Sequence, residues 1–370
     1  LGLLGVVFSV VAYDAATPFP GLYALVPVLG VVLLVLFAGE GTLVARFLSL
    51  PLLVGIGLIS YSAYLWHQPL FAFARIYMVE EPSRVAFAVL TVATFLVAYL
   101  SWKYIENPFR NRALVAARPL WIFVFSASLF LVAFVLAAHK TQGFVSRVFD
   151  PDQAAAEDMY ISYNERNFLF KKDAFDPDVP VKLLVIGNSF GRDLVNVVRE
   201  TYDLTSVGLI YRDDLSDCSL VESELGQRLF ASASMVLFAS NYSLGEPSCI
   251  NRVIDLSAEQ GNRVYFVGAK QFGHNLNWVA RTRKQERALL RNPILEEVLE
   301  QERLARAVIP KKHYLSIIDA LIDQNGNMLI TDENGRLLSA DRVHLTRYGA
   351  IYVGAQVLFL SPVTETLMPK

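Results

Sequence analysis

Apolar residues are concentrated in the first part of the chain. Five predominantly apolar stretches there approach or exceed the roughly 20 residues that a membrane-spanning helix needs. They lie at about 1–13, 22–38, 52–76, 85–105 and 119–138. Short segments with Gly, Pro and Glu separate them and favour reversal of the chain. Because a segment in hydrocarbon must satisfy its own backbone polar groups, each stretch is predicted to be helical. Residues 1–138 are therefore predicted to form a membrane α-helical bundle of about five spans.

The pattern changes after residue 180, where short β-rich runs alternate with amphipathic segments. Candidate strands lie at 181–186, 204–211, 234–239, 263–268 and 314–318. Candidate helices lie at 192–200 and near 249–260, 283–307 and 347–360. This alternation is typical of an α/β fold with a doubly wound parallel sheet. Residues 181–370 are predicted to form such a domain, and the polar, proline-containing segment 139–180 a linker or accessory segment.

Composition supports the same division of the chain. Hydrophobic residues make up 54% of it and the mean hydropathy is +0.39. Residues 1–140 contain only 8 of the 33 Lys and Arg residues and 5 of the 35 Asp and Glu residues. The net charge of −2 and the absence of a basic stripe give no electrostatic case for nucleic-acid binding. Since the chain begins inside an apolar run without Met, we interpret it as part of a longer protein.

Basic residues predict the orientation of the helices. Lys103, Arg110, Arg112 and Arg118 gather between the fourth and fifth spans, so that loop is expected in the cytoplasm. The chain after residue 138 is then expected outside, in the periplasm if the organism is Gram-negative. This arrangement predicts a multi-pass protein of the bacterial inner membrane.

The two cysteines, Cys218 and Cys249, both lie in the polar half. An extracytoplasmic location is oxidising, so one disulfide between them is a candidate. Two unrelated buried thiols remain the alternative.

One apolar stretch contains more polar residues than an anchor requires. Residues 60–69 read Ser-Tyr-Ser-Ala-Tyr-Leu-Trp-His-Gln-Pro, and their ionisable member is His67. Ionisable residues at membrane depth usually face a cavity or the interior of a bundle, which makes His67 a candidate site residue. The alternative is a Tyr and Trp belt at the membrane interface with a structural histidine. Glu106, followed closely by Pro108, is expected to end a helix.

These segments resemble the terminal membrane helices of the acyltransferase 3 family. The resemblance is carried by residues 60–69 and by Ile-Glu-Asn-Pro-Phe-Arg at 105–110, and covers about 50–112. It implies transfer of acyl groups, commonly acetyl, from a cytoplasmic donor such as acetyl-CoA to an extracytoplasmic glycan. The family's first membrane helix, with its proposed catalytic histidine, has no counterpart in the sequence.

Three short motifs in the polar half contain residues suited to acyl chemistry. Ser189 follows the strand at 181–186 and precedes a helix, whose N-terminal N–H groups can stabilise an oxyanion. Asp341 stands three residues before His344, which lets the carboxylate hold Nδ1–H while Nε2 faces a nucleophile. Asn241 closes the strand at 234–239 and has an amide that can donate to an oxyanion.

Together these motifs resemble the SGNH hydrolase family over about 181–360. The resemblance implies Ser189 as nucleophile and oxyanion donor, Asn241 as oxyanion donor, Asp341 as orienting carboxylate and His344 as base. Asn188 stands where the family usually has Asp. No glycine follows the strand at 204–211 to supply the middle oxyanion donor, so that donor is not assigned.

The leading hypothesis is O-acylation, chiefly O-acetylation, of a cell-envelope polysaccharide such as lipopolysaccharide O-antigen, peptidoglycan or exopolysaccharide, through acyl-Ser189. The alternatives are a membrane-anchored esterase or deacetylase, an inactive glycan-binding domain and, less favoured, a transporter. His139, His274 and His313 have no partners at metal-ligand spacing, and neither a metal nor a bound cofactor is predicted.

Overall fold

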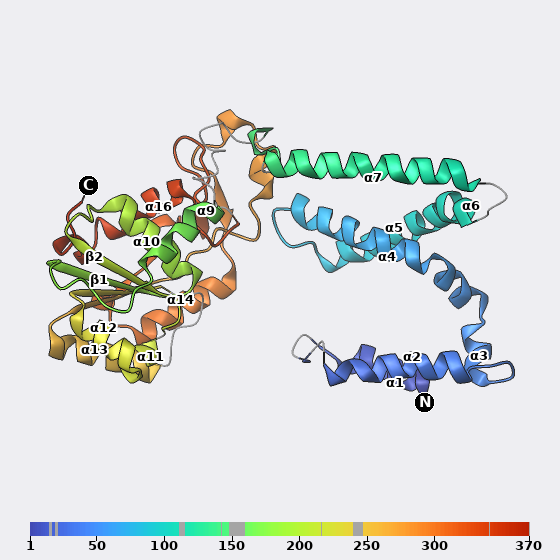
Figure 1. Ribbon diagram of the computed structural model, residues 1–370, viewed down its shortest axis with the longest axis horizontal. Coiled ribbons are helices and arrows are strands. Elements are labelled where there is room, and N and C mark those ends of the chain that lie inside the picture. The colour runs from blue at the N-terminus through green and yellow to red at the C-terminus, as the bar shows by residue number, and fades with distance from the viewer. Residues whose placement is uncertain are drawn as a thin grey trace. The chain divides into compact units, whose positions relative to one another are not determined.

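The computed structural model describes residues 1–14, 17–18, 21–110, 115–141, 143–147, 160–215, 217–239, 247–339 and 341–369. The chain separates into two compact units (Figure 1). The first comprises 1–74 and 82–126, and the second 75–81 and 127–370.

The first unit is helical. Helices α1 (Gly2–Ala12) and α2 (Leu25–Phe37) pack closely because each contributes a glycine at their contact. A Cβ atom on Gly2 would lie 2.6 Å from the Gly30 carbonyl oxygen, and one on Gly30 would lie 2.8 Å from the Gly2 carbonyl oxygen. The short helix α3 (Leu43–Leu48) begins at Thr42, whose side chain accepts a hydrogen bond from the Ala45 N–H. Side-chain caps of this kind satisfy backbone donors that have no partner within the helix.

The next two helices contain the polar motifs of this unit. Helix α4 spans Pro51–Tyr77, and α5 spans Arg84–Ser101. A π-helical turn at Trp102–Glu106 and the short α6 (Asn107–Arg110) continue α5. The Ser62 hydroxyl of α4 donates a hydrogen bond of 3.0 Å to the Glu106 carboxylate.

The expectation of five membrane spans requires correction. All five apolar stretches contain helix, but among the described residues only Arg84–Arg110 and Ala117–Lys140 (α7) are long and apolar enough, by length and composition, to cross a membrane. Helices α1 and α2 have 11 and 13 residues, too few for about 30 Å of hydrocarbon. Helix α4 is long enough, but its Ser, Tyr, Trp, His and Gln residues lower its hydropathy.

The second unit is built on a parallel five-stranded sheet with the order β2-β1-β3-β4-β6. The strands span Val181–Ile186 (β1), Val207–Arg212 (β2), Met235–Phe238 (β3), Arg263–Val267 (β4) and Tyr314–Leu315 (β6). Alternate residues of β1 enter different cores. Leu183 and Val185 join one apolar cluster with α10 (Ser189–Thr201) and α16 (Arg347–Val353). Leu184 and Ile186 join another with α11 (Asp217–Glu222), α12 (Glu224–Ser232) and α13 (Pro247–Gln260).

Helices therefore cover both faces of the sheet (Figure 1), as expected for a doubly wound domain. Since β1 lies between β2 and β3, the strand order reverses at β1. In open α/β sheets ligands bind beyond the carboxyl ends of the strands at such a switch point. The end of β1 is where Ser189 lies.

Two predicted elements differ from the structure. The helix expected over 283–307 is confined to α14 (Glu296–Val308), and Arg291–Pro293 instead forms strand β5 opposite β7 (Asn327–Leu329). A proline inside a helix removes a hydrogen bond and disfavours helical geometry in the preceding residue, which fits a helix that begins after Pro293. The expected strand at 314–318 ends at Leu315, because Ser316 caps the helix α15 (Ile317–Leu321).

Candidate active site

Ser189 is the first residue of α10 and follows β1 through a two-residue turn. The turn requires glycine at Gly187, whose φ is +148° and whose added Cβ would lie 1.7 Å from the Ala239 carbonyl oxygen. Asn188 caps the helix by accepting a hydrogen bond of 3.0 Å from the Phe190 N–H. Tight packing against β3 and a side-chain cap thus fix the position of Ser189.

Asp341 and His344 lie on the loop before α16, and the carboxylate organises that loop. Asp341 Oδ1 accepts hydrogen bonds from the N–H groups of Val343 (3.0 Å) and His344 (2.9 Å). The Ser339 hydroxyl accepts from the Arg342 N–H and donates to the His344 carbonyl oxygen. Arg342 has a φ of +97°, which non-glycine residues rarely adopt. Several hydrogen bonds therefore hold a strained turn beside His344.

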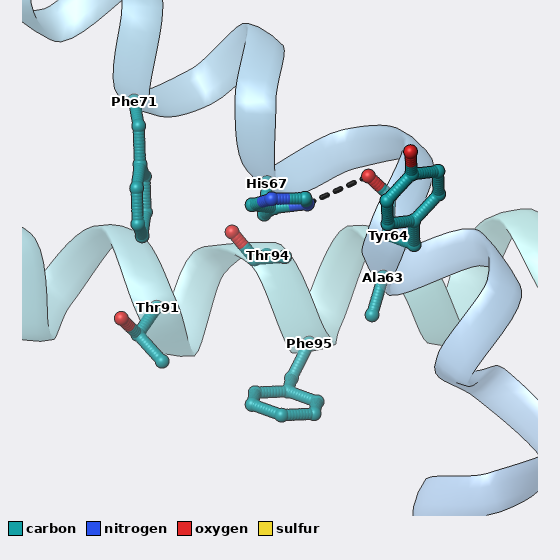
Figure 2. A pocket seen from close by; sticks show the side chains of 7 residues that line it. All are labelled: Ala63, Tyr64, His67, Phe71, Thr91, Thr94 and Phe95. Atoms are coloured by element: carbon teal, nitrogen blue, oxygen red, sulfur yellow. Dashed lines mark hydrogen bonds between the residues drawn. The ribbon is translucent and has the colours of Figure 1, made fainter. Parts of the chain in front are cut away.

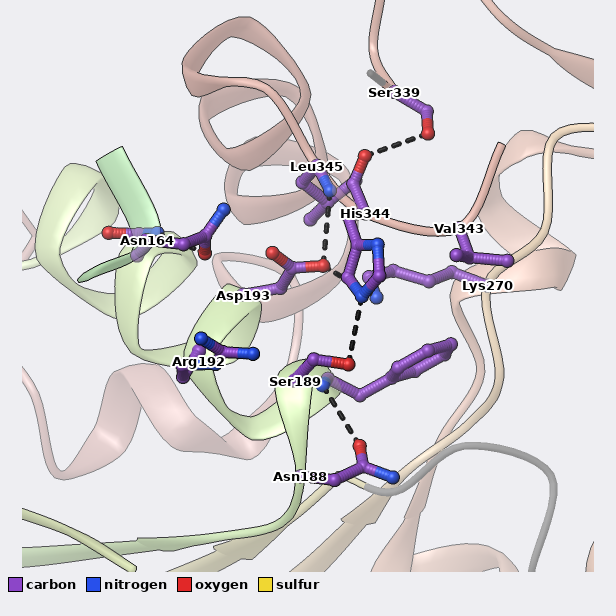
Figure 3. Close-up of polar contacts among 12 residues, drawn as sticks. Asn164, Asn188, Ser189, Arg192, Asp193, Lys270, Ser339, Val343, His344 and Leu345 are labelled. Atoms are coloured by element: carbon purple, nitrogen blue, oxygen red, sulfur yellow. Dashed lines mark hydrogen bonds and ion pairs between the residues drawn. The ribbon is translucent and has the colours of Figure 1, made fainter. Parts of the chain in front are cut away.

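The three side chains form a continuous hydrogen-bonded chain, and Figure 3 shows its link from His344 to Ser189. His344 Nδ1 lies 2.7 Å from Asp341 Oδ2, and Nε2 lies 2.8 Å from Ser189 Oγ. A carboxylate only accepts hydrogen bonds, so Nδ1 carries the proton and Nε2 accepts from the Ser189 hydroxyl. This is the geometry in which an imidazole removes the proton of a serine nucleophile.

The electrostatics of Asp341 match an orienting role. Partial burial raises its pKa, but hydrogen bonds from the His344 ring and from the His344 and Val343 N–H groups outweigh that effect and lower the pKa to about 2. Asp341 is therefore a charged acceptor at neutral pH.

Of the predicted oxyanion donors, Ser189 is at the N-terminus of α10, while Asn241 lies outside the described residues. Tyr211 of β2 also contacts this part of the site. The Tyr211 hydroxyl donates a hydrogen bond of 3.0 Å to the Asn188 carbonyl oxygen and so supports the turn before Ser189.

The sequence interpretation missed a buried ion pair next to these residues. Lys270 Nζ lies 2.7 Å from Asp193 Oδ2, with exposed side-chain fractions of 2% and 1%. Asp193 is one helical turn after Ser189, a spacing that places both on one face of α10. The four-residue spacing from Ser189 could have indicated Asp193 from the sequence. No neighbouring residue in the sequence indicates that Lys270 lies near the site.

Cys218 of α11 and Cys249 of α13 form a disulfide in the structure. It joins two helices on the face of the sheet opposite α10. It closes a loop across a sequence separation of 31 residues.

His67 lines a separate pocket of about 280 Å³ within the first unit (Figure 2). The pocket lies between α4 and α5, and its lining residues are Ala63, Tyr64, His67, Phe71, Thr91, Thr94 and Phe95. His67 Nδ1 lies 2.6 Å from the Tyr64 carbonyl oxygen, which only accepts hydrogen bonds, so Nδ1 carries the proton that it donates. Glu106 accepts the hydrogen bond from Ser62 and pairs with Arg110 at 3.3 Å. The expectation that Glu106 ends its helix is wrong, because the helix continues through Asn107–Arg110 and contains Pro108.

The described residues contain no group of three or more His, Cys, Asp or Glu side chains placed to hold a metal ion. His313, half-buried beside β4, bonds the Val264 carbonyl oxygen through Nδ1 at 2.9 Å.

Comparison with known proteins gives low-identity relatives. No protein-family model matches the chain. A Staphylococcus aureus (strain COL) protein named as an O-acetyltransferase is 32% identical over 124 residues, which are 32% of this chain and 20% of that protein. The O-acetyltransferase OatA of Staphylococcus aureus (strain NCTC 8325 / PS 47) is 38% identical over 76 residues, 20% of this chain and 13% of OatA. The chain thus spans about a fifth or less of the curated relatives that it matches.

Among solved structures, one described as an acylhydrolase of Bacteroides fragilis NCTC 9343 is 14% identical. The match covers 52% of this chain and 91% of that chain with a TM-score of 0.30. A similarity at this TM-score supports no conclusion about function.

Proposed function

We propose that the protein is an O-acyltransferase, chiefly an O-acetyltransferase, that modifies a cell-envelope polysaccharide through an acyl-Ser189 intermediate. The observation that carries the proposal is the hydrogen-bonded chain from Asp341 through His344 to Ser189. The low-identity relatives named as O-acetyltransferases support transfer of an acyl group. The acceptor is proposed to be a glycan, such as lipopolysaccharide O-antigen, peptidoglycan or exopolysaccharide.

In the first half-reaction, Ser189 Oγ attacks the carbonyl carbon of an acyl donor while His344 Nε2 takes the hydroxyl proton. The bond from the carbonyl carbon to the leaving group breaks, and the leaving group takes that proton from His344. In the second, His344 takes the proton of a glycan hydroxyl, whose oxygen attacks the acyl-serine. The ester bond to Ser189 breaks, and His344 returns the proton to Oγ. Asp341 stabilises the imidazolium that forms in each half-reaction.

We further propose that the helical unit lies in the bacterial inner membrane and delivers acyl groups derived from cytoplasmic acetyl-CoA. The α/β domain then acts in the periplasm. Two long apolar helices and the disulfide between Cys218 and Cys249 support this placement. The pocket beside His67 is the proposed site within the membrane unit.

The test is formation of an acyl-enzyme by the 370-residue chain with 4-nitrophenyl acetate, an activated acetyl ester. Mass spectrometry should place one acetyl group on Ser189; Ser189→Ala should prevent this modification, and His344→Ala should reduce its rate to a small residual value. Ser232→Ala, at an exposed serine of α12, is the matched control and should acylate normally. An inert wild-type chain that still binds glycan would identify a binding domain instead. If acyl-Ser189 forms but its acetyl group is released to water and is not transferred to added glycan oligosaccharides, the protein is an esterase.

A further inference from the structure

The Asp193–Lys270 ion pair is costly to bury, which raises the question of its role. Burial raises the pKa of the Asp193 carboxyl and lowers that of the Lys270 ammonium, because each charge is destabilised without water. Asp193 Oδ1 is buried and makes no hydrogen bond to the described residues. Apolar side chains of similar volume often stabilise a core at least as well as a buried pair. A contribution to folding stability therefore does not explain why this ion pair is buried.

The contacts of the pair lead to the catalytic base. Asp193 Oδ2, the oxygen beside Lys270, also accepts a hydrogen bond of 3.1 Å from the Leu345 N–H. Leu345 directly follows His344, so the carboxylate fixes the backbone that holds the imidazole. Asp193 and Ser189 lie on the same helix. One carboxylate thus ties the loop of the base to the helix of the nucleophile (Figure 3).

Lys270 holds that carboxylate and also contacts the aromatic wall of the site. Its Nζ lies 3.4 Å from the centroid of the Phe190 ring, a cation–π contact. The Phe190 ring packs edge to face with the His344 ring, with centroids 6.1 Å apart. The Lys270 ammonium therefore restrains both the Asp193 carboxylate and the Phe190 ring, which lie close to the imidazole of His344.

We propose that Asp193 and Lys270 are a positioning pair that holds His344 in register with Ser189. The inference rests on the proposed function, because it assigns the pair to the same acylation step. Its physical basis is that a displacement of about 1 Å in a reacting group can lower the rate about 100-fold.

Two double variants distinguish the hydrogen bond that Asp193 accepts from the Leu345 N–H from the charges of Asp193 and Lys270. Asp193→Asn/Lys270→Met removes both charges but keeps an oxygen that accepts from the Leu345 N–H. Asp193→Leu/Lys270→Met has similar volume without that acceptor. The first keeps the acceptor for Leu345 but loses the cation that restrains Asp193 and Phe190, so its kcat for 4-nitrophenyl acetate should lie between those of the wild type and the second variant. The second should lower kcat about 100-fold with KM unchanged. Asp193→Ala replaces the leucine substitution if that variant does not fold.

A double-mutant cycle with His344→Ala distinguishes positioning from general damage to the fold. Without the base, such a site retains residual catalysis from oxyanion stabilisation and binding. Asp193→Leu/Lys270→Met should leave this residual rate unchanged, since the pair acts through His344. If Asp193→Leu/Lys270→Met lowers the rate by the same factor in the wild-type and His344→Ala backgrounds, the inference is wrong. It is also wrong if the two double variants have equal rates. Glu302→Gln, which alters a buried contact to Tyr314 away from the site, should lower stability without changing kcat.

Failure of the proposed function gives a different result. If Ser189→Ala turns over the ester as fast as the wild type, the acyl-serine proposal fails. If Ser189→Ala is inactive but the pair variants show no dependence on His344, only the positioning role fails.

Discussion

Ser189 Oγ lies 2.8 Å from His344 Nε2, although 155 residues separate the two along the chain. Helix α10 carries the hydroxyl, and the loop before α16 carries the imidazole. These two helices pack on the same face of the sheet, so their core contacts set the distance between the two side chains. The proposed chemistry therefore depends on packing some way from the reacting atoms.

Asp341→Asn should lower kcat sharply while the site keeps its shape. An amide oxygen can still accept from the loop N–H groups, but it does not stabilise an imidazolium or fix the correct tautomer. Loss of the corresponding charge in a serine triad lowers kcat by about 10⁴-fold. Single-turnover acylation of Ser189 by 4-nitrophenyl acetate measures the effect. A variant with wild-type kcat would exclude Asp341 as the orienting group.

The same carboxylate should contribute to stability in a pH-dependent way. Its pKa falls from an ordinary value of 3.8 to about 2 in the folded protein, so folding favours the charged form. The contribution is complete above about pH 4 and disappears as the pH falls towards 2. Because the Asp341 side chain is 46% exposed, solvent screening limits the effect to about 1 kcal/mol or less. Denaturant unfolding of wild type and Asp341→Asn should show a difference at pH 6 that shrinks at pH 3.

Gly187→Ala should be strongly destabilising and should abolish acylation. Its Cβ would meet the Ala239 carbonyl oxygen at 1.7 Å, so the turn or β3 must move, at a cost of at least about 2 kcal/mol. Gly261→Ala is the matched control, because Gly261 also has a positive φ but open space around it. That substitution should cost only about 1 kcal/mol and leave acylation unchanged. Equal losses in thermal stability for the two variants would contradict the packing argument.

Asn188 should act as a helix cap that Asp can replace. Asn188→Ala removes the acceptor for the Phe190 N–H and should cost about 1 kcal/mol. Asn188→Asp keeps the acceptor and adds a negative charge at the N-terminus of α10, worth about 0.5 kcal/mol of stabilisation. Thermal unfolding together with the rate of ester turnover checks both. Loss of activity in Asn188→Asp would show that the uncharged amide is itself required.

Reduction of the Cys218–Cys249 disulfide should destabilise the α/β domain without altering the site. A cross-link across 31 residues stabilises a protein by about 4 kcal/mol, chiefly by restricting the unfolded chain. The melting temperature should fall by about 10 °C in dithiothreitol. Cys218→Ser/Cys249→Ser should reproduce the loss and then respond no further to the reductant. Acylation at a temperature where both forms are folded should be unchanged.

The local features of this protein follow from its sequence. The apolar run of β1 and the Gly-Asn-Ser turn place Ser189 at a strand end, because turns and strands depend on neighbouring residues. Asp341 and His344 also meet through their three-residue spacing on one loop. Alternating strands and helices indicated the parallel sheet.

The tertiary structure determines the contacts between residues that lie far apart in the sequence. The 2.8 Å contact between Ser189 and His344 depends on the strand order and on two helices sharing one core. The pairing of Asp193 with Lys270 depends on how β4 lies in the sheet relative to α10, since Lys270 follows that strand. Strand β5 forms because β7 lies opposite it. Short-range spacing fixes the direction of neighbouring side chains, but contacts across many residues exist only where packing brings distant segments together.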